Sequence, residues 1–244
     1  MSYVGDDKVL PTDNIKNKDN SLFIWLDILG FAEAVDKEEK YKELSELLKE
    51  FKQLFFDSTQ NSYDAKIISD GLIIYLKDPG RDKINLIFKE ISEKQFSFIL
   101  KNKYFIRGGI ALGSKYETDE NIEKGNQYIS NGLARAYKLE SNCIDWPLIA
   151  TDEINLKRLK DKFKINKEEF FGLEKAYNKN GKNIYFIDFI KEDDNYFELL
   201  QNKIFEFKEE PSVRNKYIWL MRYYLHKFEN YKDKIDITLK GIVL

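Results

Sequence analysis

The stretch LFIWLDILGFAEAV, residues 22–35, decides how the first part of the chain folds. It begins with five apolar residues in a row, which is typical of a buried strand, and the acidic residue Asp27 follows at once. The glycine and phenylalanine that come next predict a turn at Gly30 and a helix from Phe31. A carboxylate at the end of such a strand is either a helix cap or a ligand for something positively charged.

A second acid lies in the segment AKIISDGLIIYL, residues 65–76, in which two short apolar runs flank Asp70 and Gly71. The Asp-Gly pair is a preferred composition of tight hairpin turns, so this segment predicts two antiparallel strands. In a split β-α-β arrangement the strand that ends at Asp27 lies beside this hairpin. We therefore expect the carboxylates of Asp27 and Asp70 to lie close together at the ends of adjacent strands.

The remaining pattern predicts an α+β fold, in which an antiparallel sheet of ferredoxin-like order carries helices on one face. Helical spacing runs through residues 37–60, 81–100, 128–140 and 152–163, and strands are expected at 104–113, 147–151, 168–177 and 182–190. Two aromatic-rich helices, 195–209 and 213–231, follow on either side of Pro211, and we expect them to form packing or dimer surface. The chain thus divides into a loose arm (1–20), a core (21–190) and a C-terminal helical extension (191–244).

Composition excludes several kinds of site. The chain has one cysteine, Cys143, and one histidine, His226, so a disulfide or a zinc cluster of these residues is not expected, and any metal would be held by carboxylates, which suits Mg²⁺ or Mn²⁺. Forty Lys and Arg nearly balance forty-two Asp and Glu, so nucleic-acid and membrane binding are not expected. Without a signal-like or membrane-spanning apolar run, the chain is expected to be cytoplasmic.

Two neighbouring carboxylates without histidine suit one kind of chemistry. They can bind two hard divalent cations, which lower the pKa of a sugar hydroxyl and neutralise a triphosphate. The backbone N–H groups of Gly30 and Phe31, at the start of a helix, would face phosphate oxygens. Residues 27–31 and Asp70 therefore form a plausible phosphoryl-transfer site. Helix capping by Asp27 and plain turn chemistry for Asp70 remain the alternatives.

Four segments resemble the class III nucleotidyl cyclases, in family order over roughly residues 22–140. LDILGF (26–31) resembles their first metal motif, Asp-Ile-x-Gly-Phe, and KIISDGLIIY (66–75) resembles the hairpin with their second metal aspartate. RGGIALG (107–113) and SNGLARAYKLE (130–140) are similar to their Arg-x-Gly-Ile-x-x-Gly strand and Val-Asn-x-Ala-x-Arg-x-Glu helix. Together with the helical extension, the variant RAYKLE looks most like the bacterial pyrimidine nucleotide cyclases of Pycsar antiphage systems.

This resemblance implies a head-to-tail homodimer with composite active sites, in which residues 21–190 form the catalytic domain. One chain would hold two Mg²⁺ or Mn²⁺ ions through Asp27, Asp70 and the backbone carbonyl of Ile28. The partner chain would supply base recognition and the transition-state cation, which would be Lys138 or Arg135.

The sequence departs from the family at two positions of this composite site. Counting back from Glu140, Lys138 falls on the family's transition-state arginine, and Ala134 falls on its ribose-orienting asparagine. Lysine neutralises phosphate as a point charge rather than as a fork, and alanine cannot hydrogen-bond a sugar. Arg135, about 100° away around the helix, is the alternative cation.

Base recognition is implied at two further positions. Lys66 lies four residues before Asp70, where the family reads the base, and Gln127 lies near the second such position. For Lys66 a solvated lysine is an equal alternative. Lys182 is interpreted as a turn lysine, although the family carries a triphosphate-binding lysine near its closing strands. For Arg107 we favour a buried pair with a carboxylate over a catalytic role.

These features together predict a cyclase that converts a nucleoside triphosphate, with UTP or CTP expected, to a 3′,5′-cyclic nucleotide and pyrophosphate. The resemblance implies that the product is an antiphage second messenger read by a separate effector. A non-catalytic nucleotide-binding scaffold on the same fold is the alternative, because of Ala134 and Lys138. A diguanylate cyclase or polymerase palm ranks last, because the hairpin reads Ser-Asp-Gly-Leu and lacks the Gly-Gly-Asp/Glu-Glu-Phe signature.

Overall fold

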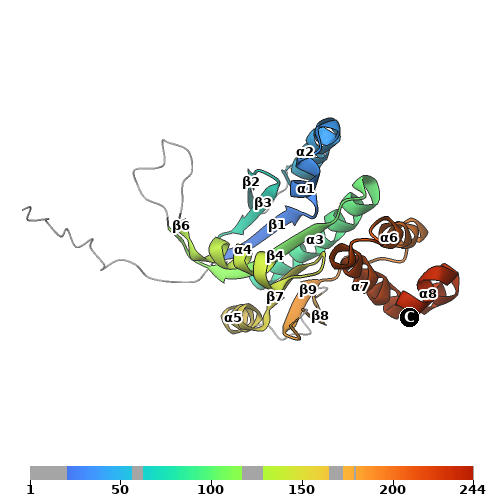
Figure 1. The fold of residues 1–244 in the computed structure, drawn as a ribbon. Helices are drawn as coiled ribbons and strands as arrows, with labels where there is room; N and C mark the ends of the chain where they lie inside the picture. Colours follow the sequence, from blue (N-terminus) through green and yellow to red (C-terminus); the bar gives the residue numbers. More distant parts are fainter. Residues whose placement is uncertain (1–20, 57–62, 117–128, 165–172, 179, 244) are drawn as a thin grey trace, which may run out of the picture.

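The computed structural model describes residues 21–56, 63–116, 129–164, 173–178 and 180–243. Its centre is a seven-stranded sheet in the order β2-β3-β1-β4-β7-β9-β8 (Figure 1). These strands are β1 (Ser21–Ile28), β2 (Asp64–Ile68), β3 (Gly71–Leu76), β4 (Ile106–Gly113), β7 (Ile149–Asp152), β8 (Leu173–Tyr177) and β9 (Asn183–Ile187). A separate two-stranded pair joins β5 (Lys115–Tyr116) to β6 (Ile129–Ser130). The arm of residues 1–20 lies outside the described residues.

The helices follow the predicted spacing, with ends that differ by a few residues. They are α1 (Phe31–Val35), α2 (Tyr41–Phe56), α3 (Arg81–Asn102), α4 (Asn131–Cys143), α5 (Glu153–Phe163), α6 (Asp194–Glu206), α7 (Pro211–Lys227) and α8 (Ile237–Val243). Short 3₁₀ helices, η1 (Glu38–Lys40) and η4 (Glu229–Lys234), precede α2 and α8. No helix within the described ranges is both long and apolar enough to cross a membrane.

The α+β class and the ferredoxin-like order are confirmed by the strand pairing. Along the chain, β1 leads through α1 and α2 to the β2–β3 hairpin, and α3 then leads to β4. In space β1 lies between β3 and β4 and pairs with both in antiparallel register. This is the split β-α-β arrangement expected from the sequence. The β4–β7 pair is parallel, so the sheet is mixed rather than purely antiparallel.

Helices cover both faces of the sheet, which differs from the one-face arrangement expected from the sequence. Leu22, Ile24, Leu26 and Ile28 of β1 belong to a core cluster with α2 and α3. Phe23 of β1 belongs to a second cluster, which includes residues of α4, α6 and α7. Figure 1 shows α4 in front of β1 and β4, on the side opposite α2 and α3.

Glycines explain how α4 approaches the sheet so closely. A Cβ atom added at Gly109 of β4 would lie 2.0 Å from the carbonyl oxygen of Ala136 in α4. At Gly113 an added Cβ would lie 2.2 Å from the Cα of Gly132 in the same helix. Because these neighbours are backbone atoms, no side-chain movement can make room for a methyl group.

We expect Gly109→Ala to lower the free energy of unfolding by about 2–3 kcal/mol, because the added methyl must push the backbone of α4 away from β4. Urea unfolding monitored by circular dichroism measures this change. Gly80→Ala is the matched control, since an added Cβ there has no neighbour within 4 Å. Equal stability of the two variants would show that α4 does not sit directly on β4.

The C-terminal extension packs into the same core as the sheet, as its aromatic content predicted. Tyr217 of α7 lies 5.1 Å from Phe105 between ring centroids, and Trp219 lies 5.9 Å from Phe186 of β9. Pro211 begins α7 at a position where its missing N–H costs nothing. Helix α8 was not predicted, because its seven residues are too few for a clear helical period.

Candidate active site

The two acids singled out in the sequence lie together in the structure. Asp27 is at the end of β1, and Asp70 lies in the two-residue turn between Ile68 and its partner Gly71. The Asp70 carboxylate lies close enough to that of Asp27 for its charge to raise the Asp27 pKa, and the two groups can share a proton when one of them is protonated. The turn residues are therefore Ser69 and Asp70, one position earlier than the Asp-Gly pair predicted, and Ser69 carries the positive φ of 58°. Sheet adjacency thus brings the carboxylates together.

Gly71 serves a different purpose from the predicted one. A Cβ added at this position would lie 2.2 Å from the indole ring of Trp25 on β1. The glycine therefore leaves space for Trp25, whose ring also lies 5.5 Å from that of Tyr137 on α4. The turn shifts by one residue because the sheet needs this glycine beneath the indole ring.

Asp27 does not cap the helix that follows it. The residue before α1 is Gly30, with φ of 80°, and no side chain accepts a hydrogen bond from that helix end. The alternative interpretation of Asp27 as a helix cap is therefore wrong. The left-handed conformation at Gly30 is accessible to glycine at low cost, so this residue sets the sharp turn between β1 and α1.

Arg107 lies next to Asp27 and pairs with a third acid, Glu140, so the three acids and Arg107 form one carboxylate cluster. It lies opposite Asp27 in the β1–β4 register, and its guanidinium is 4.0 Å from the Asp27 carboxylate. The same guanidinium forms an ion pair with Glu140 of α4, whose side chain is 5% exposed. The expectation of a buried carboxylate partner for Arg107 is thus confirmed. Glu140 had no predicted role, although an acid four residues after the buried Ala136 lies on the same buried face of α4 and signals a buried partner.

Burial and negative charge dominate the electrostatics of the cluster. Burial, the largest cause, acts together with the charges of Asp70 and Glu140 to raise the pKa of Asp27 to about 7, and the charge of Arg107 opposes them. Burial also raises the pKa of Glu140, although Arg107 lowers it. Asp27 therefore lacks enough positive charge around it when it is ionised.

The two adjacent carboxylates form a site that a hard divalent cation would stabilise. Two adjacent carboxylates disfavour each other's ionisation, and a cation between them removes that cost. Within the described residues no group of three or more His, Cys, Asp and Glu side chains could hold a metal. The protein donors would thus be Asp27, Asp70 and a backbone carbonyl. Mg²⁺ commonly binds through one or two carboxylates and completes its shell with water and substrate phosphates.

We expect the Asp27→Asn variant to be more stable than the parent at pH 8, by about 2–4 kcal/mol, when metal is chelated. The pKa of Asp27 is about 7 in the folded chain and 3.8 ordinarily. The folded state thus binds the extra proton between these values, and the parent loses stability as pH rises from about 4 to about 7. Thermal unfolding at pH 5 and pH 8 measures the difference. An equal gain at both pH values would contradict the raised pKa.

The backbone candidates lie next to Asp27. The side chains of Ile28 and Phe31 are buried in the core, so only their backbone groups could serve a ligand. Helix α1 has five residues, Phe31–Val35, and its first N–H groups lack partners within the helix. The N–H of Leu29 is already bonded to the carbonyl of Phe105. Phosphate binding by Gly30 and Phe31 remains a prediction.

The other residues predicted for the site lie on β2 and α4. Lys66 is exposed on β2 and shares a row with Ile73 and Trp25, so it lies two strands from the strand of Asp27 and four residues before Asp70. Lys138 is exposed on α4 and shares that helix face with Ala134. Arg135 points back toward its own sheet, where it donates a hydrogen bond of 2.9 Å to the carbonyl of Leu112.

Gln127 lies outside the described residues. Lys182 is exposed in the β8–β9 connection, where its backbone N–H bonds the side chain of Asn178, so it occupies the turn that was expected.

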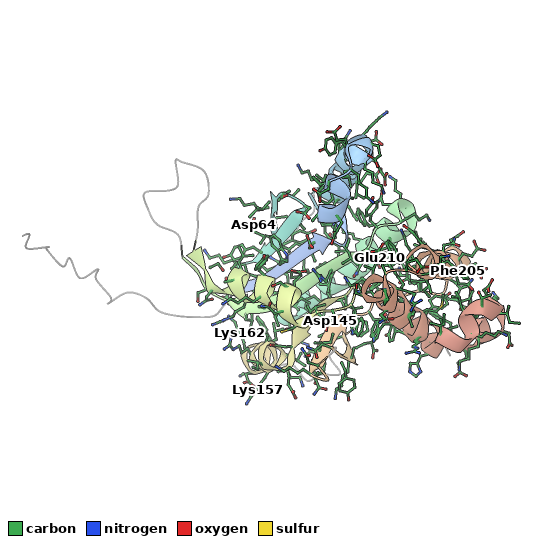
Figure 2. All side chains as sticks on the ribbon, in the orientation of Figure 1. Asp64, Asp145, Lys157, Lys162, Phe205 and Glu210 are labelled. Atoms are coloured by element: carbon green, nitrogen blue, oxygen red, sulfur yellow. The ribbon has the colours of Figure 1, made fainter. Side chains whose placement is uncertain are left out.

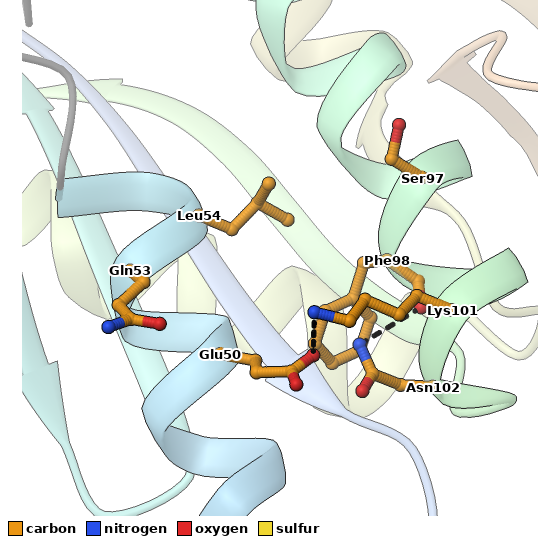
Figure 3. Close-up of a pocket in the computed structure, with 7 residues that line it drawn as sticks. All are labelled: Glu50, Gln53, Leu54, Ser97, Phe98, Lys101 and Asn102. Carbon is orange, nitrogen blue, oxygen red and sulfur yellow. Dashed lines mark hydrogen bonds and ion pairs between the residues drawn. The ribbon is translucent and has the colours of Figure 1, made fainter.

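A groove of about 300 Å³ lies between α2 and α3, away from the carboxylates (Figure 3). Its lining residues are Glu50, Gln53, Leu54, Ser97, Phe98, Lys101 and Asn102. Lys101 and Glu50 form an ion pair of 3.1 Å across it, so its main charges neutralise each other. The groove offers no arrangement of groups suited to catalysis.

No protein-family model matches the chain, and no curated protein matches it either. Solved structures with a similar fold include the adenylyl cyclase CyaB from P. aeruginosa, at 15% identity and a TM-score of 0.49 over 72% of this chain and 96% of that one. The guanylyl cyclase Cya2 matches at 16% identity and a TM-score of 0.47, over 72% and 94% of the two chains. The dimeric guanylyl cyclase domain of the RhoGC fusion protein from the fungus Blastocladiella emersonii matches at 14% identity and 0.47, over 70% and 97%. At these values the activities named belong to those proteins.

Proposed function

We propose that the protein is a nucleotide cyclase that converts a nucleoside triphosphate to a 3′,5′-cyclic nucleotide and pyrophosphate. The observation that carries the proposal is the meeting of Asp27 and Asp70 at adjacent strand ends, directly before the Gly30 turn. The four cyclase-like sequence segments support it, since two of them supply these acids in the expected order.

In this proposal Asp27, Asp70 and the carbonyl of Ile28 hold two Mg²⁺ or Mn²⁺ ions. When bound, the ions polarise the 3′-hydroxyl and neutralise charge on the phosphates. The 3′-oxygen forms a bond to the α-phosphorus, the bond from that phosphorus to the bridging oxygen breaks, pyrophosphate leaves, and the hydroxyl proton passes to solvent. The N–H groups of Gly30 and Phe31 orient the phosphates, and Arg107 keeps the Asp27 carboxylate in place.

The site is completed by a second copy of the chain. Lys138 is the preferred transition-state cation, because it is exposed and makes no hydrogen bond or ion pair with the described part of its own chain. Arg135 is the weaker candidate, since its guanidinium is already bonded to Leu112. Lys66 and Gln127 are proposed to read the base.

The proposed substrate is UTP or CTP, and the proposed product is a second messenger in antiphage defence that acts through a separate effector. The test is incubation of the purified protein with ATP, GTP, UTP and CTP separately, with Mn²⁺, followed by mass spectrometry of the products. A cyclic pyrimidine nucleotide is the expected product. A cyclic purine nucleotide as the product would support the proposed cyclase activity and show that the proposed pyrimidine substrate is wrong.

A non-catalytic nucleotide-binding scaffold is the second candidate. Ala134 favours it, because a methyl group on the exposed face of α4 cannot hydrogen-bond a ribose. Its signature in the same assay is saturable nucleotide binding without any cyclic product.

A further inference from the structure

Lys216 of α7 connects the C-terminal extension to the carboxylate cluster. Its charge interacts with that of Arg107 in β4 and with those of Glu140, Asp145 and Glu33. The neighbouring Tyr217 packs on Phe105, two residues before Arg107, which fixes this part of α7 at the same end of the sheet. Lys216 thus lies among α1, α4, α7 and β4.

The setting of Lys216 is unfavourable for a lysine. The side chain is partly buried, and burial together with the charge of Arg107 lowers its pKa. Glu33, Asp145 and Glu140 attract it, yet Lys216 makes no ion pair or hydrogen bond with the chain as described. Other lysines of the extension do form ion pairs, including Lys203 with Glu206 and Lys234 with Asp194. A partly buried cation without a partner lowers stability unless a ligand supplies the missing charge.

The position of Lys216 indicates which ligand that is. Glu33, one of its neighbours, lies in α1 directly after the Gly30 turn. Arg107, another neighbour, lies 4.0 Å from Asp27. The next residue, Tyr217, packs on Phe105, whose carbonyl accepts the N–H of Leu29 just before the Gly30 turn, so Lys216 lies at the end of the sheet that carries the proposed phosphate site. An anion extending from the carboxylates past the Gly30 turn would meet its ammonium group.

We infer that Lys216 binds the terminal phosphates of the nucleoside triphosphate, in the same chain that holds the metal ions. This inference rests on the proposed function and adds to it a substrate-binding residue from the extension. The ammonium group donates hydrogen bonds to phosphate oxygens and offsets their charge, and these bonds break when pyrophosphate leaves the site.

The test measures binding of inorganic tripolyphosphate with Mg²⁺ by isothermal titration calorimetry, a probe that cannot be cyclised. Lys216→Met should weaken this binding about tenfold to a hundredfold, while Lys216→Arg should retain most of it. Binding of uridine or cytidine without phosphates should stay unchanged. The matched control is Lys208→Met, which removes an exposed lysine just before α7.

Thermal unfolding separates ligand binding from a structural role. Without ligand, Lys216→Met should match or exceed the parent in melting temperature, because a partly buried unpaired charge has been removed. A lower melting temperature with unchanged tripolyphosphate affinity would overturn the inference and make Lys216 a counter-charge of Glu140. Failure of the parent to cyclise any nucleotide, with tripolyphosphate binding that depends on Lys216, would instead overturn the proposed function and keep this anion site.

Discussion

Asp27→Asn and Asp70→Asn should each reduce cyclic nucleotide formation by about a thousandfold or more. Each change removes a charged metal ligand and keeps the shape of the side chain, so the surrounding sheet stays intact. The two carboxylates are brought together at neighbouring strand ends, and one alone leaves the proposed ions with half of their charged protein ligands. The effect is measured as the initial rate of product formation, with saturating Mn²⁺ and with the nucleotide that the four-nucleotide assay identifies as the substrate.

Two controls make the result specific. Asp64→Asn carries out the same chemical change on an exposed residue of the same hairpin, labelled in Figure 2, and should leave the rate unchanged. With metal chelated, the Asp27→Asn variant should also be more stable than the parent at pH 8, so its loss of activity is not explained by unfolding. Full activity in either aspartate variant would show that the two-metal assignment is wrong.

Arg107→Met should lower the free energy of unfolding by about 3–5 kcal/mol. The substitution leaves Glu140, which is 5% exposed, without its ion-pair partner, and it removes the cation nearest to Asp27. Breaking a buried pair from one side costs far more than the pair contributes, because the remaining charge stays buried and unpaired. Chemical denaturation at pH 8 gives the value.

A double variant tests the cause of that loss. Arg107→Met combined with Glu140→Gln should recover part of the stability, since the buried charge is removed with its partner. Arg158→Met, which removes an exposed arginine of α5, is the control for loss of an arginine in general. If the Arg107 and Arg158 variants unfold alike, the Arg107–Glu140 pair is not a stabilising contact.

Local patterns were enough to predict the hairpin, the first strand and the meeting of Asp27 with Asp70. Period-two runs and turn composition act over a few residues, and the split β-α-β order then makes the two segments adjacent. The same local reasoning placed the turn one residue late. It could not show that Gly71 is needed beneath Trp25, because that contact joins residues far apart in sequence.

The parts of the site that were missed depend on long-range packing. Glu140 and Lys216 reach Arg107 only because α4 and α7 converge on one end of β4. The glycines at 109 and 113, four residues apart on one strand face, were the available signal that a helix sits on that face. Helical periodicity identifies the buried side of α4 and says nothing of which sheet face it covers.

The shared aromatic core of the sheet and the extension has a consequence for regulation. Tyr217 contacts Phe105 directly, and Phe105 accepts the backbone hydrogen bond of Leu29 beside the carboxylates. A protein that binds α7 and shifts it would therefore displace the backbone next to the proposed active site without entering that site. We expect the whole described chain to melt in a single calorimetric transition, so any such trigger would act on one cooperative body rather than on a detachable sensor.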